Sequence, residues 1–284
     1  MEIGTKFKDL SSYCQNMTAS MEDKLFFVDM LPDYDSISKQ RKLIVDFGCA
    51  DGTMTRMLSS IFSNDADVIG YDISTSMINL AKSKCDSGQE KNLMFTEHWD
   101  DVKAELNDKK KHCKVLILSS VIHEVYSYAT KENSVSDFWD KVINSGFDYV
   151  VIRDMSLNEA MTNTIPSYFT MESLYAHLDI KYGDQLKDFE KIWGSIRKSK
   201  KNLYHFLLKY MWTINWDREV RENYFPLSTE ELMEIMGKNY NLIFFSHFNI
   251  PFLVNKIEND IKHLIKIDEP THIKCIYKIK ENIK

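Results

Sequence analysis

The sequence has little glycine or proline and no long hydrophobic run. Its 284 residues include 9 glycines and 5 prolines, far fewer than a collagen-like or low-complexity chain contains. The longest apolar runs, around residues 114–121 and 241–245, are much shorter than the roughly 20 residues that a membrane-spanning helix needs. Residues 1–10 contain no apolar stretch typical of a secretory signal. We therefore expect a folded cytoplasmic protein without a membrane span.

Cysteine is sparse as well. The five cysteines are widely spaced, and none has a histidine nearby at metal-ligand spacing: Cys14, Cys49, Cys85, Cys113 and Cys275. This pattern argues against both a disulfide framework and a structural zinc site. We expect all five to be reduced thiols.

Positive charge is in deficit over the chain as a whole. Lys and Arg total 36 and Asp and Glu total 42, which gives a formal charge of −6 and is untypical of a nucleic-acid-binding protein. The exception is residues 181–221, where ten basic residues stand against five acidic ones. This local excess keeps nucleic-acid binding by that segment open.

Short apolar runs alternate with helical periodicity between residues 41 and 155. The runs typical of strands are residues 42–47, 67–71, 92–96, 114–119 and 148–152. Between them, apolar residues recur at the spacing of one-sided helices, for example Met54, Met57, Leu58, Ile61 and Phe62. This alternation predicts βαβ units and a mostly parallel sheet.

The pattern changes after the fifth strand. About eighty residues are mainly helical before two further strand-like runs, residues 242–249 and 271–280. Ser228 and Glu231 predict a capping box for a helix that ends near Gly237. The sequence therefore predicts an α/β fold: a seven-stranded, mostly parallel sheet with helices on both faces and a helical cap inserted after the fifth strand.

A glycine-bearing turn joins the first strand to its helix. Residues 43–52 end in Gly48-Cys49-Ala50-Asp51-Gly52, which places free backbone N–H groups at the edge where open α/β sheets bind ligands. The next strand ends in Asp72, an acid positioned to hold a ribose diol. Because Ala50 occupies the middle position, the dinucleotide pattern G-x-G-x-x-G is absent. These residues predict a nucleotide-type site that does not bind a pyrophosphate.

The same residues resemble the first motif of class I S-adenosylmethionine-dependent methyltransferases, an acid and any residue followed by a glycine-rich run. Residues 46–52 match it except at Ala50, residues 68–81 resemble the second motif, and residues 116–124 resemble the fourth. The resemblance covers roughly residues 41–155 and the strand pair at 242–280. It implies S-adenosyl-L-methionine as the cofactor.

The resemblance also implies roles for individual positions. Asp46 and Gly48 would shape the pocket for the methionine end, Asp72 would hold the ribose, and Ser119 and Ser120 would flank the methionine tail. The full implied set is Asp46, Gly48, Cys49, Ala50, Gly52, Asp72, Ile73, Met77, His98, Trp99, Ser119 and Ser120. Purely structural interpretations stay open, since Asp46 could cap a turn, Asp72 could cap the following helix, and residues 97–101 could be a solvated loop.

Candidate catalytic residues follow the fourth and fifth strands. A neutral His123 could take a proton from a hydroxyl or amine nucleophile, and Glu124 or Asp154 could orient it. Many methyl transfers need no strong base, so a structural His123 is the alternative. Arg153 could bind a charged substrate group or form an ion pair within the scaffold.

The helical insertion leaves from and returns to this edge, so we expect it to cover the cleft and choose the substrate. Trp212, Trp216, Arg218 and Tyr224 are the candidate substrate contacts, because aromatic walls with an arginine suit a planar or anionic group. The expected organisation is an N-terminal helical cap segment (1–40), a cofactor-binding core (41–155), a helical cap (156–227) and a C-terminal completion of the sheet (228–284).

Three functions compete. The leading hypothesis is an enzyme, EC 2.1.1, that methylates an oxygen or nitrogen of a small molecule. An RNA or tRNA methyltransferase would use the basic run at residues 197–201 for phosphate contacts. A non-catalytic protein would only bind S-adenosylmethionine. No metal is expected, because three ligands cannot be assembled at this edge without forcing Asp154 into that role. The oligomeric state is left open.

Overall fold

Seven strands form one sheet in the computed structural model, which describes residues 9, 21–31, 41–85, 91–108, 111–130, 134–167 and 169–281. The strand order is β3-β2-β1-β4-β5-β7-β6. The strands are β1 Arg41–Phe47, β2 Ala66–Tyr71, β3 Leu93–Thr96, β4 Lys111–Ser119, β5 Tyr149–Met155, β6 Tyr240–Phe248 and β7 His272–Ile279. All neighbouring pairs among β1 to β5 are parallel, and β7 runs antiparallel to both β5 and β6. The predicted mostly parallel, seven-stranded sheet is confirmed.

Helices cover both faces of this sheet, as predicted. The helices of the core are α3 Thr53–Ile61, α4 Thr75–Ser83, α5 Trp99–Leu106, α6 Ile122–Tyr128, α7 Val135–Asn144 and α12 Thr229–Gly237. Successive residues of β1 point to opposite faces: Leu43 and Val45 pack with α5, α7 and α12, whereas Ile44 packs with α3. Because these parallel strands are buried on both faces, their sequences are continuous apolar runs.

The start of α12 shows why the local sequence predicts its helix well. Ser228 accepts a hydrogen bond from the backbone N–H of Glu231, and the Glu231 side chain accepts one from the backbone N–H of Ser228. This reciprocal capping box satisfies two N–H groups that a helix start leaves without partners. The helix ends at Gly237, so both predicted ends are confirmed.

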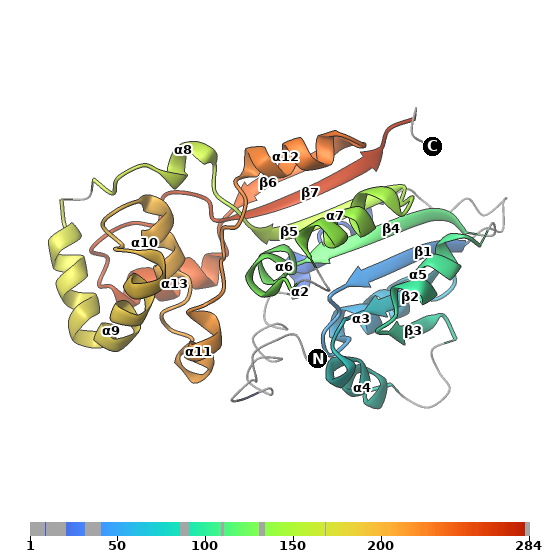
Figure 1. The fold of residues 1–284 in the computed structure, drawn as a ribbon, viewed down its shortest axis with the longest axis horizontal. Coiled ribbons are helices and arrows are strands. Elements are labelled where there is room, and N and C mark those ends of the chain that lie inside the picture. Colours follow the sequence, from blue (N-terminus) through green and yellow to red (C-terminus); the bar gives the residue numbers. More distant parts are fainter. Residues whose placement is uncertain are drawn as a thin grey trace.

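The chain between β5 and α12 forms a separate helical lobe. It contains α8 Glu159–Thr162, α9 Met171–Trp193, α10 Lys200–Leu207, the 3-10 helix η2 Thr213–Asn215 and α11 Trp216–Glu219. Figure 1 shows these helices beside the end of the sheet to which β4 and β5 point. The helix α13 Pro251–Asp260, which follows β6, packs into the same apolar cluster as α9 and α10.

Only part of the expected N-terminal cap segment lies in the described residues. There, α2 Met21–Lys24 and the 3-10 helix η1 Val28–Met30 precede β1. Phe27 and Leu31 pack against the same face of the sheet as α3. Most of residues 1–40, Cys14 included, lies outside the described part of the chain.

No helix in the described ranges has the length and apolar character needed to cross a membrane.

Candidate active site

The turn after β1 depends on glycine at two positions for different reasons. Gly48 has φ +74°, and a Cβ placed there would lie 2.6 Å from Cγ2 of Val121. Gly52 has φ +72°, and a Cβ there would lie 2.6 Å from the ring of Phe95 on β3. Ala50 also has positive φ, at 46°. Gly48 therefore permits close approach to the loop after β4, whereas Gly52 permits packing of the turn on the neighbouring strands.

Asp72 ties this turn to the end of β2. Its Oδ2 accepts a hydrogen bond from the Ala50 N–H at 2.9 Å, and its Oδ1 accepts one from the Ser74 N–H at 2.9 Å. Burial raises the pKa of Asp72 to about 6. Each carboxylate oxygen can accept more than one hydrogen bond, so the same group can also receive ligand hydroxyls.

A cleft of about 1090 Å³ of open space lies in front of this turn. Among the predicted cofactor-binding residues, those that line it are Gly48, Ala50, Asp72, Ile73, Met77 and Ser120. Its opposite wall comes from α6 and α7, including Tyr128, Phe138 and Lys141, which the sequence analysis did not assign to a site.

A smaller space of about 340 Å³ lies against the same turn and is lined by Lys24, Asp46, Gly48, Cys49 and Ser119, among others. Asp46 accepts a 2.6 Å hydrogen bond from Oγ1 of Thr55, and burial raises its pKa to about 6. The buried hydroxyl of Ser119 has no hydrogen-bond partner within the described part of the chain. Because buried polar groups are nearly always paired, this orphaned hydroxyl indicates a place for a polar ligand atom.

Six predicted cofactor-binding residues do not line the large cleft: Asp46, Cys49 and Ser119, which line the smaller space, and Gly52, His98 and Trp99. Trp99 is buried in the core, with its ring centroid 5.6 Å from that of Phe47 and 5.0 Å from that of Tyr71. His98 is exposed at the start of α5 and does not line the cleft. Gly52 packs on Phe95, and a Cβ on Gly70 would lie 3.0 Å from Sγ of Cys49. The Cys49 thiol thus faces the sheet, where burial raises its pKa.

His123 lies at the start of α6 and is held by Asp154 at the end of β5. Its Nδ1 is 2.7 Å from Oδ1 of Asp154, and Asp154 also accepts hydrogen bonds from the N–H groups of Ile122 and Met155. Burial alone would lower the pKa of His123, but the Asp154 carboxylate outweighs it and raises the pKa to about 9. Asp154 therefore favours the protonated form of the ring, whereas the sequence predicts a neutral imidazole.

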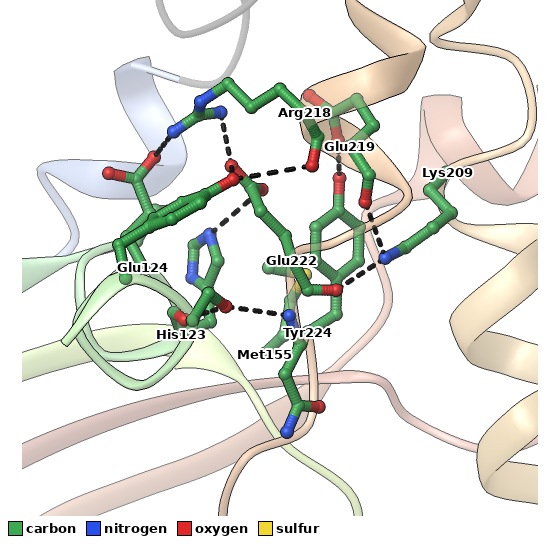
Figure 2. Close-up of polar contacts among 12 residues, drawn as sticks. His123, Glu124, Met155, Lys209, Arg218, Glu219, Glu222 and Tyr224 are labelled. Carbon is green, nitrogen blue, oxygen red and sulfur yellow. Dashed lines mark hydrogen bonds and ion pairs between the residues drawn. The ribbon is translucent and has the colours of Figure 1, made fainter. Parts of the chain in front are cut away.

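Arg218 links the insertion to the core. It extends from α11, and its Nη2 lies 2.7 Å from Oε1 of Glu124, while its Nη1 pairs with Oε1 of Glu222 (Figure 2). The phenol of Tyr128 also donates to Oε1 of Glu222, at 3.1 Å. Burial raises the pKa of Glu222, and the nearby Glu219 carboxylate adds to the effect. Arg218 is thus engaged by two carboxylates of the protein.

Arg153 is likewise engaged within the scaffold. Its Nε donates to Oδ2 of Asp23 at 2.9 Å, and its Nη1 donates to Oγ of Ser120 at 2.9 Å. Asp23 belongs to α2, so this contact attaches the N-terminal segment to the carboxyl edge of the sheet. The ion-pair interpretation of Arg153 therefore describes its contacts in this structure.

A second cavity, with about 1490 Å³ of open space, lies between this edge and the insertion. The predicted residues that line it are Ser120, His123, Glu124, Arg153, Trp212, Arg218 and Tyr224. Ser120, Glu124 and Arg218 line both this cavity and the large cleft, so the two spaces adjoin there. Trp216 does not line it, because its Nε1 donates to Asp188 within the lobe, at 3.1 Å.

The structure adds charged residues to this region that the sequence analysis missed. Glu219 and Glu222 line the second cavity, and Lys209 is fully buried behind them. The Lys209 ammonium donates to the carbonyl oxygens of Glu219 and Glu222 at 2.8 and 2.6 Å and lies 4.3 Å from the ring centroid of Tyr224 (Figure 2). The available signal was a single lysine within the apolar run at residues 203–211.

Residues 44–146 match a family model described as a methyltransferase domain. No curated protein matches the sequence.

Several solved structures are similar in fold. An S-adenosylmethionine-dependent methyltransferase from Archaeoglobus fulgidus is 14% identical, with a TM-score of 0.41, and the match covers 95% of this chain and 100% of that one. The cyclopropane synthase MmaA2 from Mycobacterium tuberculosis is 9% identical, with a TM-score of 0.48 and coverage of 92% and 84%. Geranyl diphosphate C-methyltransferase from Streptomyces coelicolor is 10% identical, with a TM-score of 0.47 and coverage of 94% and 81%.

Proposed function

We propose that this chain transfers a methyl group from S-adenosyl-L-methionine to an oxygen or nitrogen of a small-molecule acceptor. The match of residues 44–146 to a methyltransferase domain and the mostly parallel seven-stranded sheet support a class I, S-adenosylmethionine-dependent enzyme. The observation that carries the proposal is the junction of two spaces at the carboxyl edge of the sheet. The cleft lined by Asp72 meets the cavity lined by His123 at the shared residues Ser120, Glu124 and Arg218. Methyl transfer requires the methyl group of the cofactor to lie next to the acceptor atom, and this junction would allow that contact.

The residues present fit the cofactor. Asp72 offers a fixed carboxylate to the ribose hydroxyls, and Ile73 and Met77 offer an apolar wall to the adenine. Asp46, Lys24 and the orphaned Ser119 hydroxyl, which line the smaller space, would hold the charged methionine end. The cofactor supplies the activated methyl group when it is bound.

The chain's own part in the reaction is to position the acceptor and exclude water. We call the second cavity the acceptor cavity. The proposed catalytic residues are His123, Glu124 and Asp154, because His123 and Glu124 line this cavity and Asp154 orients the His123 ring. Since His123 is protonated in this state, it donates a hydrogen bond to the acceptor and becomes a base only after losing that proton. Tyr224 and Trp212 contribute aromatic surface, and Arg218 and Arg153 contribute positive charge to the same cavity.

The proposed division of the chain follows from this arrangement. Residues 41–155 and 228–284 build the sheet and hold the cofactor, and the helical cap of residues 156–227 selects the acceptor. The lobe supplies Trp212, Arg218 and Tyr224 to the acceptor cavity, while α13 supplies Phe252 and Leu253 to it. Enclosure by a lobe of the same chain favours a small molecule over a macromolecular acceptor.

The basic residues of the segment 181–221 are partly paired with acidic side chains, which argues against an RNA acceptor. Lys181 pairs with Asp260, Arg197 with Glu172 at 2.8 Å, and Lys200 with Glu269 at 2.9 Å. Charges engaged in this way are less available to phosphates, although such pairs on a surface are weak. Binding to RNA that falls steeply with added salt would favour the RNA alternative.

The direct test is methyl transfer from isotope-labelled S-adenosylmethionine to a fractionated cell extract. We expect label to appear in a small-molecule fraction with the parent protein and to be greatly reduced with His123→Ala, which should still bind S-adenosylhomocysteine. Binding of S-adenosylhomocysteine with no transfer to any fraction would favour the non-catalytic alternative. Label in the RNA fraction would reject the small-molecule acceptor.

A further inference from the structure

The contact between the insertion and the core brings three potential metal ligands together. His123 and Glu124 lie in α6, and Glu222 follows α11 in the insertion. One ligand atom of each lies within 4.8 Å of those of the other two, and none of the three side chains is fully exposed. We propose that His123, Glu124 and Glu222 form a binding site for a divalent transition-metal ion such as Zn²⁺ or Mn²⁺.

The orientation of His123 is that of a metal ligand. Its Nδ1 is fixed by Oδ1 of Asp154 at 2.7 Å, and Asp154 is itself held by the backbone N–H groups of Ile122 and Met155. A carboxylate that orients the second nitrogen of a histidine is the usual outer partner of a metal-bound imidazole. This contact directs the other nitrogen, Nε2, toward the carboxylates of the cluster.

The second nitrogen of this buried ring has no hydrogen bond within the described residues. Its nearest ionic neighbour is Oε2 of Glu222, at 4.0 Å, which is too far for a hydrogen bond (Figure 2). A tetrahedral Zn²⁺ about 2.0 to 2.1 Å from each ligand holds its ligand atoms roughly 3.4 Å apart. Side-chain shifts on the order of 1 Å would therefore bring the three groups onto one ion.

Arg218 does not block such an ion. It approaches both Glu124 and Glu222 through their Oε1 atoms. A carboxylate has two oxygens and about four acceptor positions, so each group can contact Arg218 and a metal at once. The guanidinium then orients the two carboxylates in the same way that Asp154 orients His123.

The charge around the cluster favours a cation. Four carboxylates, those of Glu124, Asp154, Glu219 and Glu222, lie in this contact network (Figure 2 labels three of them). The cations joined to the same network are Arg218, Lys209 and, without the metal, His123, whose proton a bound ion would displace. Buried carboxylates in excess of their cations are costly, and a divalent ion would offset that excess.

The ligand types indicate which ion would bind. Imidazole suits Zn²⁺ and Fe²⁺, and the two carboxylates also suit Mn²⁺, whereas a site for Mg²⁺ or Ca²⁺ would normally offer oxygen ligands alone. Because Glu124 lines both the cleft and the acceptor cavity, the ion would lie in the wall between them. Its use in polarising an acceptor oxygen rests on the proposed function, but its binding does not.

The experiment uses untagged protein stripped with a chelator and then titrated with Zn²⁺ or Mn²⁺ by calorimetry, with the bound metal measured by elemental analysis after dialysis. We expect one ion per chain. His123→Ala and Glu222→Gln should each weaken binding at least tenfold. Asp154→Asn, which removes no metal ligand but changes the group that orients His123, should weaken it by roughly 10- to 100-fold.

The matched control is Glu219→Gln. Glu219 is a buried carboxylate of the same region, but it accepts a hydrogen bond from the Tyr224 phenol and is not one of the three ligands. Its replacement removes one charge from the network but no ligand atom, so it should weaken metal binding much less than His123→Ala or Glu222→Gln does. Thermal unfolding of each variant checks that it folds, and the absorption spectrum of Co²⁺ bound to the parent protein tests for nitrogen and carboxylate ligands without any substitution.

No stoichiometric ion on the parent protein, or undiminished binding by Glu222→Gln, would overturn the proposal. S-adenosylhomocysteine binding, measured on the same samples, separates this outcome from failure of the proposed function. A protein that binds the nucleoside but no metal rejects only the metal site. A protein that binds metal but not the nucleoside rejects only the methyltransferase function.

Discussion

The backbone N–H of Ala50 donates a hydrogen bond to Oδ2 of Asp72 at 2.9 Å. This contact joins the turn after β1 to the end of β2, and a second bond from Ser74 fixes the other carboxylate oxygen. The structural and ligand-binding interpretations of Asp72 are therefore compatible, because the bonds that hold the carboxylate also orient it toward the cleft. The affinity for the cofactor should depend on this one side chain.

Replacing Asp72 by Ala should weaken binding of S-adenosylhomocysteine by about 1 to 3 kcal/mol, since a charge-assisted hydrogen-bonding group is lost. Isothermal calorimetry measures the change. Asp67→Ala is the matched control, because Asp67 lies on the same strand at its amino end and pairs with Arg41. Equal affinities of the Asp72 variant and the parent protein would exclude the ribose contact.

Cofactor affinity should also fall as the pH decreases through about 6. Burial raises the pKa of Asp72 to about 6, opposed by the bonds from Ser74 and Ala50 and assisted by the Glu124 charge. The ribose hydroxyls donate to the ionised carboxylate, so binding is strongest above this pKa and weakens as the group gains a proton. Titrations between pH 5 and 8 should show the loss in the parent protein and a flatter profile in Asp72→Asn.

Gly48→Ala should destabilise the protein more than Gly146→Ala. Both glycines have positive φ, +74° and +80°, so each substitution costs on the order of 1 to 2 kcal/mol of backbone strain. A Cβ at position 146 meets nothing within 4 Å, whereas one at position 48 would lie 2.6 Å from Cγ2 of Val121. Urea unfolding should give Gly48→Ala a further loss of about 1 to 3 kcal/mol.

The clash with Val121 has its own check. If it causes the additional loss, Val121→Ala should recover part of that loss in the Gly48→Ala protein and none in the Gly146→Ala protein. A purely additive double variant would assign the effect to backbone strain alone.

Arg218→Gln should lower the free energy of unfolding by about 3 to 5 kcal/mol, because it leaves the buried Glu222 without its cation. Arg197→Gln is the surface counterpart, since Arg197 pairs with the exposed Glu172 and its loss should cost about 0 to 1 kcal/mol. Thermal or denaturant unfolding of both proteins gives the comparison. Similar small losses would show that Arg218 does not attach the insertion to the core.

Much of the core could be predicted from the sequence. The apolar runs marked all seven strands, and the capping box of Ser228 and Glu231 and the stop at Gly237 were found where predicted. Gly48 and Asp72 could be placed at one edge because parallel strands bring their carboxyl ends together. These features depend on hydrogen bonds and periodicities within a few residues, which the local sequence encodes directly.

The tertiary structure alone decided which side chains face a ligand. Trp99 lies where its motif predicts, yet its ring packs against Phe47 and Tyr71 in the core. Glu222 reaches His123 only because the lobe folds back onto the edge of the sheet. Such contacts depend on how distant elements pack and on the closing of long loops, which no local spacing encodes.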